Sequence, residues 1–139
     1  MTLDTIPSIA KEIIEKAHKV NSDTATVITL EGDLGAGKTT LTQEISRKLK
    51  VKENVNSPTF VIMKKYGIID KKFKQLIHID AYRFNSSEQL LKLRWQELLS
   101  DKNNLIIIEW PENVPECIPK DALKVKLSHI DDNTRTVEF

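Results

Sequence analysis

Apolar residues three or four positions apart recur in three segments of the chain, and this spacing predicts three helices. The first covers residues 7–19, and the second covers residues 39–50. The third runs from about residue 87 to residue 99, where Ser86 or Ser87 is suited to be the N-cap. Each pattern leaves one apolar face, so we expect each helix to pack against a common core.

Between these helices lie short runs of β-branched and apolar residues, which predict strands. The runs within residues 24–31 and 104–109 are almost wholly apolar, as in buried parallel strands. Two further pairs of strands flank turn residues and predict hairpins. The predicted strands lie within residues 24–31, 55–80 (turning at 67–72), 104–109 and 122–139 (turning at 131–133). The pattern predicts an α/β fold with a mixed, mostly parallel central sheet flanked by helices, with antiparallel hairpin additions.

Length, charge and cysteine content limit the classes of protein to which the chain can belong. The chain has 139 residues, and we expect one domain over residues 1–139. Its 21 basic and 20 acidic side chains nearly balance, so charge alone gives no argument for binding nucleic acid or a membrane surface. One cysteine, Cys117, excludes an internal disulfide. No leader peptide or membrane span is predicted at sequence level, and we expect a cytoplasmic protein without a membrane partner.

Three of the four glycines fall between residues 32 and 37, directly after a predicted strand. Gly32, Gly37, Lys38 and Thr39 fit the phosphate-loop pattern G-x-x-x-x-G-K-[ST]. Glycines let backbone N–H groups approach an anion, a lysine reaches the outer phosphates, and a threonine hydroxyl ligates Mg²⁺. An ordinary glycine-rich turn is the alternative, but the strand before and the helix after the motif favour phosphate binding and a P-loop NTPase fold.

Two acidic residues end predicted strands. Glu109 follows four apolar residues, and Asp80 ends the stretch QLIHID. Open α/β sheets bind ligands at the carboxyl ends of their strands, so both carboxylates reach the phosphate loop if these strands are parallel neighbours. Carboxylates also end strands simply because loops are solvated, and that alternative remains open here.

Four other side chains are candidates for the site because of their positions in the sequence. Pro58 fixes the backbone before Thr59, whose hydroxyl resembles a switch threonine, although a plain strand start explains it too. Arg83 could face phosphate, a carboxylate or solvent. By strand alternation, we expect Trp110 to face away from Glu109. By the same rule, we expect His78 to lie on the same face of its strand as Asp80. No second histidine or cysteine lies at the spacing of a zinc site, so we do not expect His78 to bind zinc.

The segments GDLGAGKTT, SPTF, HIDAYR and IIIEW occur in one order and spacing. Together they resemble the TsaE (YjeE) family, small bacterial P-loop ATPases required for threonylcarbamoyl modification of adenosine 37 in tRNA. The resemblance covers residues 24–111 well. It implies an ATP-hydrolysing helper subunit that works with TsaD and TsaB, contacts tRNA only through that complex, and uses ATP and Mg²⁺.

The resemblance also implies a set of site residues. Thr39 and Glu109 would serve the metal, and Asp80, Glu109 and Thr59 would take catalytic roles. The nucleotide-binding set would be Gly32, Asp33, Leu34, Gly35, Ala36, Gly37, Lys38, Thr39, Thr40, Trp110 and Arg135.

The chain departs from the family pattern at two places. Arg94 stands where glycine is usual, which suggests a different turn or one continuous helix. The usual Ser/Thr-Glu-Thr pattern near the N-terminus is not clear, and that region of the family tends to lie near the adenine.

Three other functions compete with the helper ATPase. A small-molecule kinase on a P-loop scaffold needs an arginine-bearing lid and an acceptor region, but the chain has four arginines and no obvious insertion. A GTPase-like switch needs an N-K-x-D guanine reader, and DKNN at residues 101–104 does not match. A regulatory nucleotide-binding module would be preferred if Glu109 were dispensable for turnover.

Overall fold

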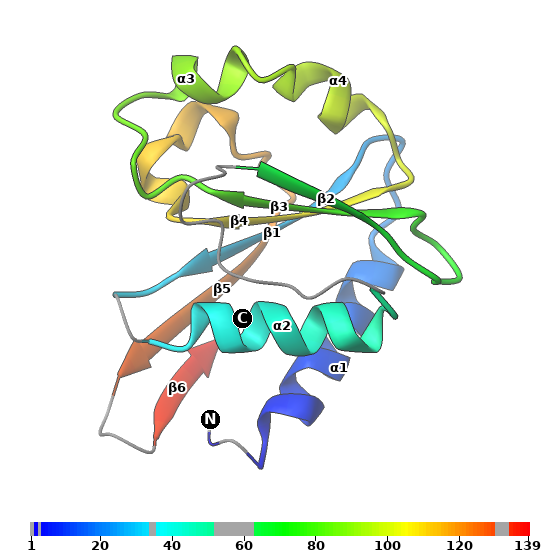
Figure 1. Ribbon diagram of the computed structural model, residues 1–139, viewed down its shortest axis with the longest axis vertical. Helices are drawn as coiled ribbons and strands as arrows, with labels where there is room; N and C mark the ends of the chain where they lie inside the picture. Colours follow the sequence, from blue (N-terminus) through cyan, green and yellow to red (C-terminus); the bar gives the residue numbers. More distant parts are fainter. Residues whose placement is uncertain (1, 3, 34–35, 52–62, 130–133) are drawn as a thin grey trace.

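A six-stranded sheet lies between two layers of helices (Figure 1). The computed structural model describes residues 2, 4–33, 36–51, 63–129 and 134–139. Across the sheet the strands follow the order β2-β3-β4-β1-β5-β6. Their bounds are β1 Thr26–Glu31, β2 Met63–Gly67, β3 Gln75–Asp80, β4 Asn104–Glu109, β5 Leu123–His129 and β6 Arg135–Glu138.

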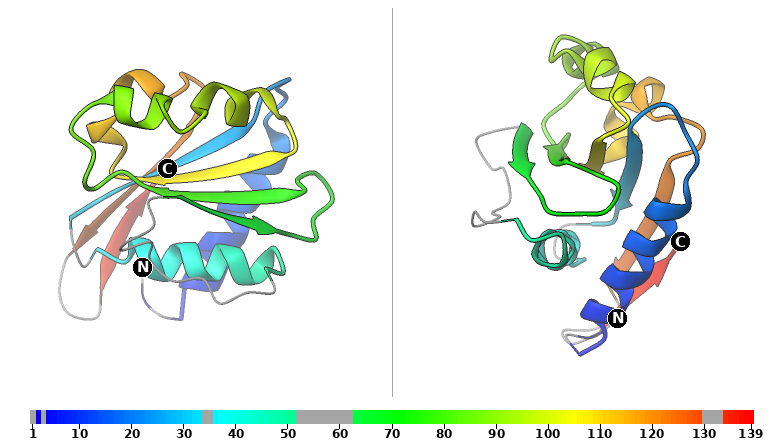
Figure 2. Two further views of the ribbon diagram at one scale, coloured as in Figure 1. Left: turned by 45° about the horizontal axis from the view of Figure 1, so that its top comes forward. Right: turned by 90° about the vertical axis from the view of Figure 1, so that its right-hand side faces the viewer.

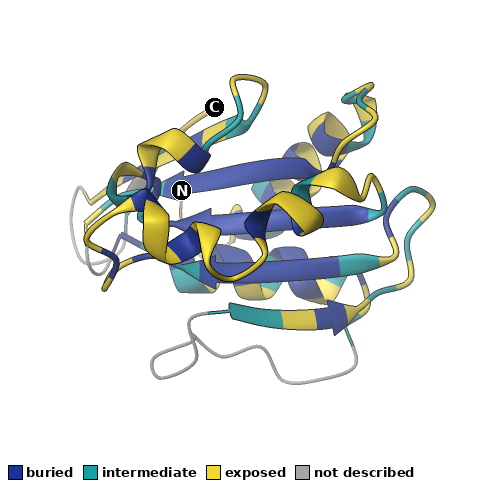
Figure 3. Cartoon of the chain, turned by 90° about the horizontal axis from the view of Figure 1, so that it is seen from above, coloured by how far each residue is buried: buried dark blue, intermediate teal, exposed yellow. Residues whose placement is uncertain are grey.

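The four inner strands are parallel and the two outer strands are antiparallel. Strands β3, β4, β1 and β5 run in one direction. Strand β2 pairs antiparallel with β3, and β6 with β5, as the two predicted hairpins require. All residues of β4 and most of β1 and β3 are buried (Figure 3), as expected for parallel strands covered on both faces. The predicted mixed, mostly parallel α/β sheet is therefore confirmed.

Each face of the sheet packs against its own pair of helices (Figure 2). Helices α1 (Ile6–Lys19) and α2 (Lys38–Lys48) cover one face, and α3 (Ser87–Leu91) and α4 (Trp95–Ser100) lie on the other with two 3₁₀ turns, Pro111–Asn113 and Pro115–Cys117. Strand alternation separates the two cores, because Ile107 joins the α1–α2 side whereas Ile106 and Ile108 join the α3–α4 side. Among the described residues, no helix combines the length and the apolar character that crossing a membrane requires.

The third predicted helical segment consists of two short helices, so of the two alternatives for Arg94 the structure has the different turn and not one continuous helix. Ser86 is the N-cap of α3, as predicted, and Glu88 lies in its first turn. The break falls at Arg94, which takes the left-handed backbone conformation with φ 61° and ψ 39°. The bend that a glycine would ease is thus formed by an arginine. It buries Trp95, which is 0% exposed and donates its indole N–H to the carbonyl of Cys117.

The left-handed conformation predicts that Arg94→Gly stabilises the protein. A non-glycine residue in this conformation costs roughly 1 kcal/mol. The ion pair from Arg94 to Glu97 is 3.9 Å long and highly exposed, so its loss matters little. We expect the free energy of unfolding in urea to rise by about 0.5–1 kcal/mol.

Lys92 offers the matched control, since it is also exposed but has a right-handed helical backbone with φ −67°. Lys92→Gly should lower the free energy of unfolding by about 0.5–1 kcal/mol. A loss of stability in Arg94→Gly equal to that in Lys92→Gly would show that the bend is unstrained.

Candidate functional site

Two glycines of the phosphate-loop motif take backbone conformations that side chains rarely adopt. Gly32 and Gly37 take φ values of +153° and +99°, and Gly37 is the N-cap of α2. A Cβ on Gly32 would lie 2.7 Å from the backbone oxygen of Leu127 on β5 and 3.1 Å from the Cβ of Ala36. The loop therefore passes against β5 where a side chain cannot fit, and it leads directly into the amino end of an eleven-residue helix.

Lys38 is the first residue of α2, and its side chain folds back over the loop. The ammonium donates a hydrogen bond to the carbonyl oxygen of Gly32. It also lies 3.8 Å from the ring centroid of Trp110, a cation–π contact. Lys38 is 5% exposed, so this charged group is almost entirely removed from water.

The parallel register brings both predicted carboxylates to the same edge of the sheet as the loop. Asp80 of β3 lies directly beside Glu109 of β4, and Glu109 lies beside Leu30 of β1. Because registered residues in neighbouring strands point to the same face, Asp80 and Glu109 share the face covered by α2. The strands that end in Asp80 and Glu109 are therefore parallel neighbours, as the sequence analysis required for both carboxylates to reach the phosphate loop.

Lys38 and the acidic residues influence one another's pKa values. Burial lowers the pKa of Lys38, while Glu109, Glu112, Asp80 and Asp33 act to raise it. Burial raises the pKa of Asp80, and the neighbouring charge of Glu109 raises it further, although a hydrogen bond from the Tyr82 N–H acts against both. One buried cation thus faces several carboxylates, and the carboxylate pair repels itself.

This set of donors fits a hard cation such as Mg²⁺. The side-chain oxygens of Asp80 and Glu109 come from adjacent strand ends, and Thr39 lies in the first turn of α2. Mg²⁺ prefers oxygen ligands and usually takes one or two carboxylates together with phosphates and water. Within the described ranges, no group of three or more His, Cys, Asp or Glu residues able to hold a metal occurs.

Comparison with known proteins decides the family. A family model described as "Threonylcarbamoyl adenosine biosynthesis protein TsaE" matches residues 2–137. The chain belongs to the TsaE family.

Relatives and a solved structure agree. The tRNA threonylcarbamoyladenosine biosynthesis protein TsaE of Bacillus subtilis is 35% identical over 115 residues, which cover 81% of this chain and 68% of that protein. The protein of the same name from Haemophilus influenzae is 31% identical over 93% of this chain and 78% of its own length. A crystal structure of Bacillus subtilis YdiB has a TM-score of 0.62 and 28% identity, and covers 94% of this chain and 77% of that one. The predicted P-loop fold and the predicted family are confirmed, and the kinase alternative has no support among these relatives.

Several of the predicted site residues surround the TsaE phosphate loop, and some cannot be placed. Thr39 and Thr40 lie in the first turn of α2, the first half-buried and the second exposed. Leu34, Gly35 and Thr59 lie outside the described residues. For Arg135 only the backbone is described, as the first residue of β6.

The expectation that Trp110 faces away from Glu109 is met only in part, because strand alternation does not extend to Trp110. Strand β4 ends at Glu109, and Trp110 takes φ 59° and ψ 52°. This left-handed backbone lets the indole reach Lys38, while the side chain also packs against the α3–α4 core on the other face of the sheet. The exposed ring of Tyr82 lies beside the indole, with the ring centroids 5.0 Å apart. An aromatic pair thus borders the lysine of the phosphate loop.

Sequence reasoning missed the contact between His78 and Glu109. The Nε2 atom of His78 lies 2.5 Å from Oε2 of Glu109, and both side chains are almost completely buried. Alternation correctly placed His78 on the face of Asp80, but the partner lies 31 positions away. The signal available was a histidine inside an apolar strand, and the parallel register was needed to name its partner.

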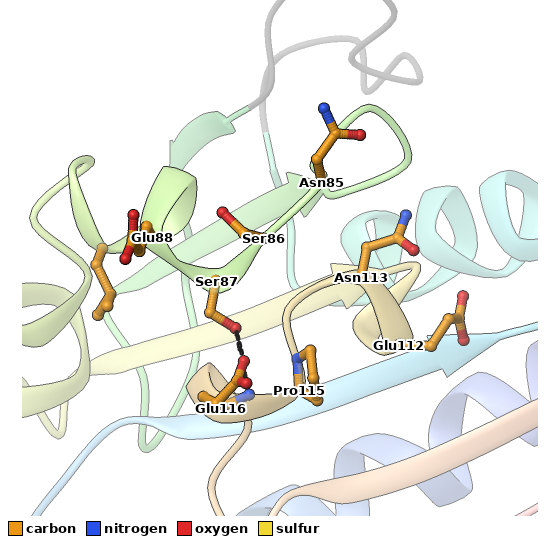
Figure 4. Close-up of a pocket in the computed structure, with 9 residues that line it drawn as sticks. Asn85, Ser86, Ser87, Glu88, Glu112, Asn113, Pro115 and Glu116 are labelled. Atoms are coloured by element: carbon orange, nitrogen blue, oxygen red, sulfur yellow. Dashed lines mark hydrogen bonds between the residues drawn. The ribbon is translucent and has the colours of Figure 1, made fainter.

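Beside the TsaE site lies an acidic pocket of about 710 Å³ (Figure 4). It lies between the amino end of α3 and the two 3₁₀ turns, and Glu88, Glu112 and Glu116 are among its lining residues. The Ser87 hydroxyl donates to Glu116 across it. Burial raises the pKa of Glu112, and Glu31 raises it further. Glu112 links this pocket to Lys38, whose charge acts in the opposite direction.

The tight packing of the loop predicts that Gly32→Ala is strongly destabilising. The new methyl group would collide with backbone at Leu127 and the backbone would remain at a φ that L-residues rarely adopt. We expect the free energy of unfolding to fall by about 2 kcal/mol.

Gly67 of β2 is the matched control, because a Cβ there meets nothing within 4 Å. Gly67→Ala should change the free energy of unfolding by no more than about 0.5 kcal/mol. Equal effects of the two substitutions in urea titrations would contradict the close approach of the loop to β5.

Proposed function

We propose that the protein is an ATP-binding and ATP-hydrolysing helper subunit that acts with TsaD and TsaB in N6-threonylcarbamoylation of adenosine 37 in tRNA. One observation carries the catalytic part of this proposal. Lys38, at the start of α2, faces the adjacent strand-end carboxylates Asp80 and Glu109 across a buried site. The membership in the TsaE family supports the pathway. We propose a cytoplasmic location and contact with tRNA only through the complex.

Phosphate binding follows from the loop and the helix. The backbone N–H groups of residues 32–39 would surround the phosphates, and the amino end of α2 would add its positive dipole. Lys38 would exchange the Gly32 carbonyl and the Trp110 ring for phosphate oxygens, because a charge-assisted hydrogen bond to an anion is stronger than one to a neutral carbonyl. Nucleotide binding would therefore release the contact between Lys38 and Trp110.

Hydrolysis requires that the carboxylates hold metal and water. Thr39 and Glu109 would hold Mg²⁺, directly or through water, and the metal would neutralise charge on the phosphates. Asp80 or Glu109 would orient the attacking water and accept its proton. Since burial and Glu109 both raise the pKa of Asp80, a bound cation would favour its charged form.

The near balance of basic and acidic side chains supports a helper role and not direct binding of RNA. The formal net charge of the chain is only +1. Phosphate contacts dominate the affinity of proteins that bind nucleic acid directly, and those proteins are usually basic. We therefore propose that ATP turnover supports the cycling of the TsaB–TsaD enzyme that handles tRNA.

Two substitutions separate nucleotide binding from turnover. Lys38→Ala should weaken ATP binding about 100-fold, because it removes the cation that faces the phosphates. Glu109→Gln keeps the side-chain shape and should leave the affinity for ATP within about threefold, while hydrolysis falls about 100-fold or more. Isothermal titration and phosphate release with purified TsaB and TsaD present measure both.

Lys11→Ala and Glu97→Gln are suitable controls, since both residues are exposed on helices away from the site. They should behave as the wild type. Full turnover by Glu109→Gln would reject the catalytic role and favour a regulatory nucleotide-binding module.

The partners are tested by association. We expect the purified protein to bind a TsaB–TsaD complex, and we expect Lys38→Ala to lose any increase in binding that ATP produces. Size-exclusion chromatography with and without ATP provides the measurement. A chain that elutes apart from TsaB and TsaD under both conditions would end the helper-subunit proposal.

A further inference from the structure

A histidine lies deep in the sheet directly behind the candidate site. His78 is 0% exposed, on β3 between two apolar residues that face the opposite core. Its Nε2 atom contacts Oε2 of Glu109 at 2.5 Å, from the neighbouring strand. Register explains the contact, because Glu109 lies beside Asp80, and His78 precedes Asp80 by two positions on the same face.

Glu109 needs this partner for a physical reason. A carboxylate buried without a hydrogen bond is strongly unfavourable, and the side chain of Glu109 is 4% exposed. The ammonium of Lys38 instead donates to Gly32 and lies over Trp110. Within the described part of the chain, His78 is the side chain that hydrogen-bonds to Glu109.

The second ring nitrogen of His78 makes no hydrogen bond to the described residues. This nitrogen, Nδ1, is buried. A buried N–H without an acceptor is costly, so the hydrogen belongs on Nε2, which faces the carboxylate. The ring's single polar contact is therefore the one to Glu109.

We propose that His78 is a positioning residue for Glu109. Its Nε2–H holds Oε2 at the end of β4, so that the carboxylate keeps one orientation toward Lys38 and the phosphate loop. This inference rests on the proposed ATPase function and adds a residue to it. Holding a reacting group in place matters, since outer partners of metal-binding side chains typically contribute 10- to 100-fold to activity or metal affinity.

Two amide substitutions test the position of the donor. In His78→Gln, the new amide nitrogen reaches about as far as Nε2 of the histidine. In His78→Asn, the amide nitrogen reaches only as far as Nδ1. We expect His78→Gln to retain kcat for ATP hydrolysis within about threefold, and His78→Asn to lose about 10- to 100-fold. The dissociation constant for ATP without Mg²⁺ should stay within about twofold in both. Glu97→Gln, at an exposed position on α4, should match the wild type.

A spectroscopic measurement tests the contact without activity. The chain has three histidines, so a ¹⁵N-histidine spectrum of the whole protein is simple to assign. We expect a downfield Nε2–H proton for His78 that shifts in Glu109→Gln and keeps its position in Glu97→Gln. Absence of any response to Glu109→Gln would overturn the proposal.

The kinetic outcomes distinguish this proposal from the function on which it rests. If the wild type with TsaB and TsaD turns over ATP and His78→Asn matches it, the positioning role is wrong and the ATPase function stands. If His78→Gln and His78→Asn lose activity and thermal stability equally, His78 only fills space. If the wild type shows no turnover although the ¹⁵N contact is observed, the proposed ATPase function itself fails.

Discussion

The parallel pairing of β3, β4 and β1 is the constraint on which the site depends. That pairing places Asp80 beside Glu109 and Glu109 beside Leu30, at the strand ends where the phosphate loop leaves β1. A slip by one residue would turn Glu109 toward the core formed with α3 and α4. The apolar residues that alternate between two separate cores oppose such a slip, because each would have to change sides. Burial of ordinary isoleucines and leucines therefore fixes where the charged groups meet.

The charged groups at this edge of the sheet influence one another. One lysine, almost buried, faces Asp33, Asp80, Glu109 and Glu112. Burial acts to lower the pKa of the lysine and to raise those of Asp80 and Glu112. A triphosphate with Mg²⁺ would give Lys38 an anion and the carboxylates a cation. Under the proposed function, these charges would be better satisfied with a metal nucleotide than without one.

Sequence patterns were sufficient for the strands, the phosphate loop and the family, but not for contacts set by register. The spacing of Gly32, Gly37 and Lys38 predicted the loop, and apolar runs predicted β1 and β4. The bond from His78 to Glu109 depends on which strands are neighbours, and no local pattern encodes that. The bends at Arg94 and at Trp110 have a shared cause. Both residues take left-handed backbone conformations that their side chains do not announce, one breaking a predicted helical segment and the other ending a strand.

A crystal structure with Mg²⁺ and a non-hydrolysable ATP analogue tests the central claim most directly. We expect the triphosphate to lie along residues 32–39 and Lys38 Nζ to have left the Gly32 carbonyl and the Trp110 ring for phosphate oxygens. We also expect Mg²⁺ at about 2.1 Å from the Thr39 hydroxyl, on the side facing Glu109. A triphosphate bound elsewhere, for instance in the acidic pocket beside α3, with Lys38 still on Gly32, would contradict this expectation.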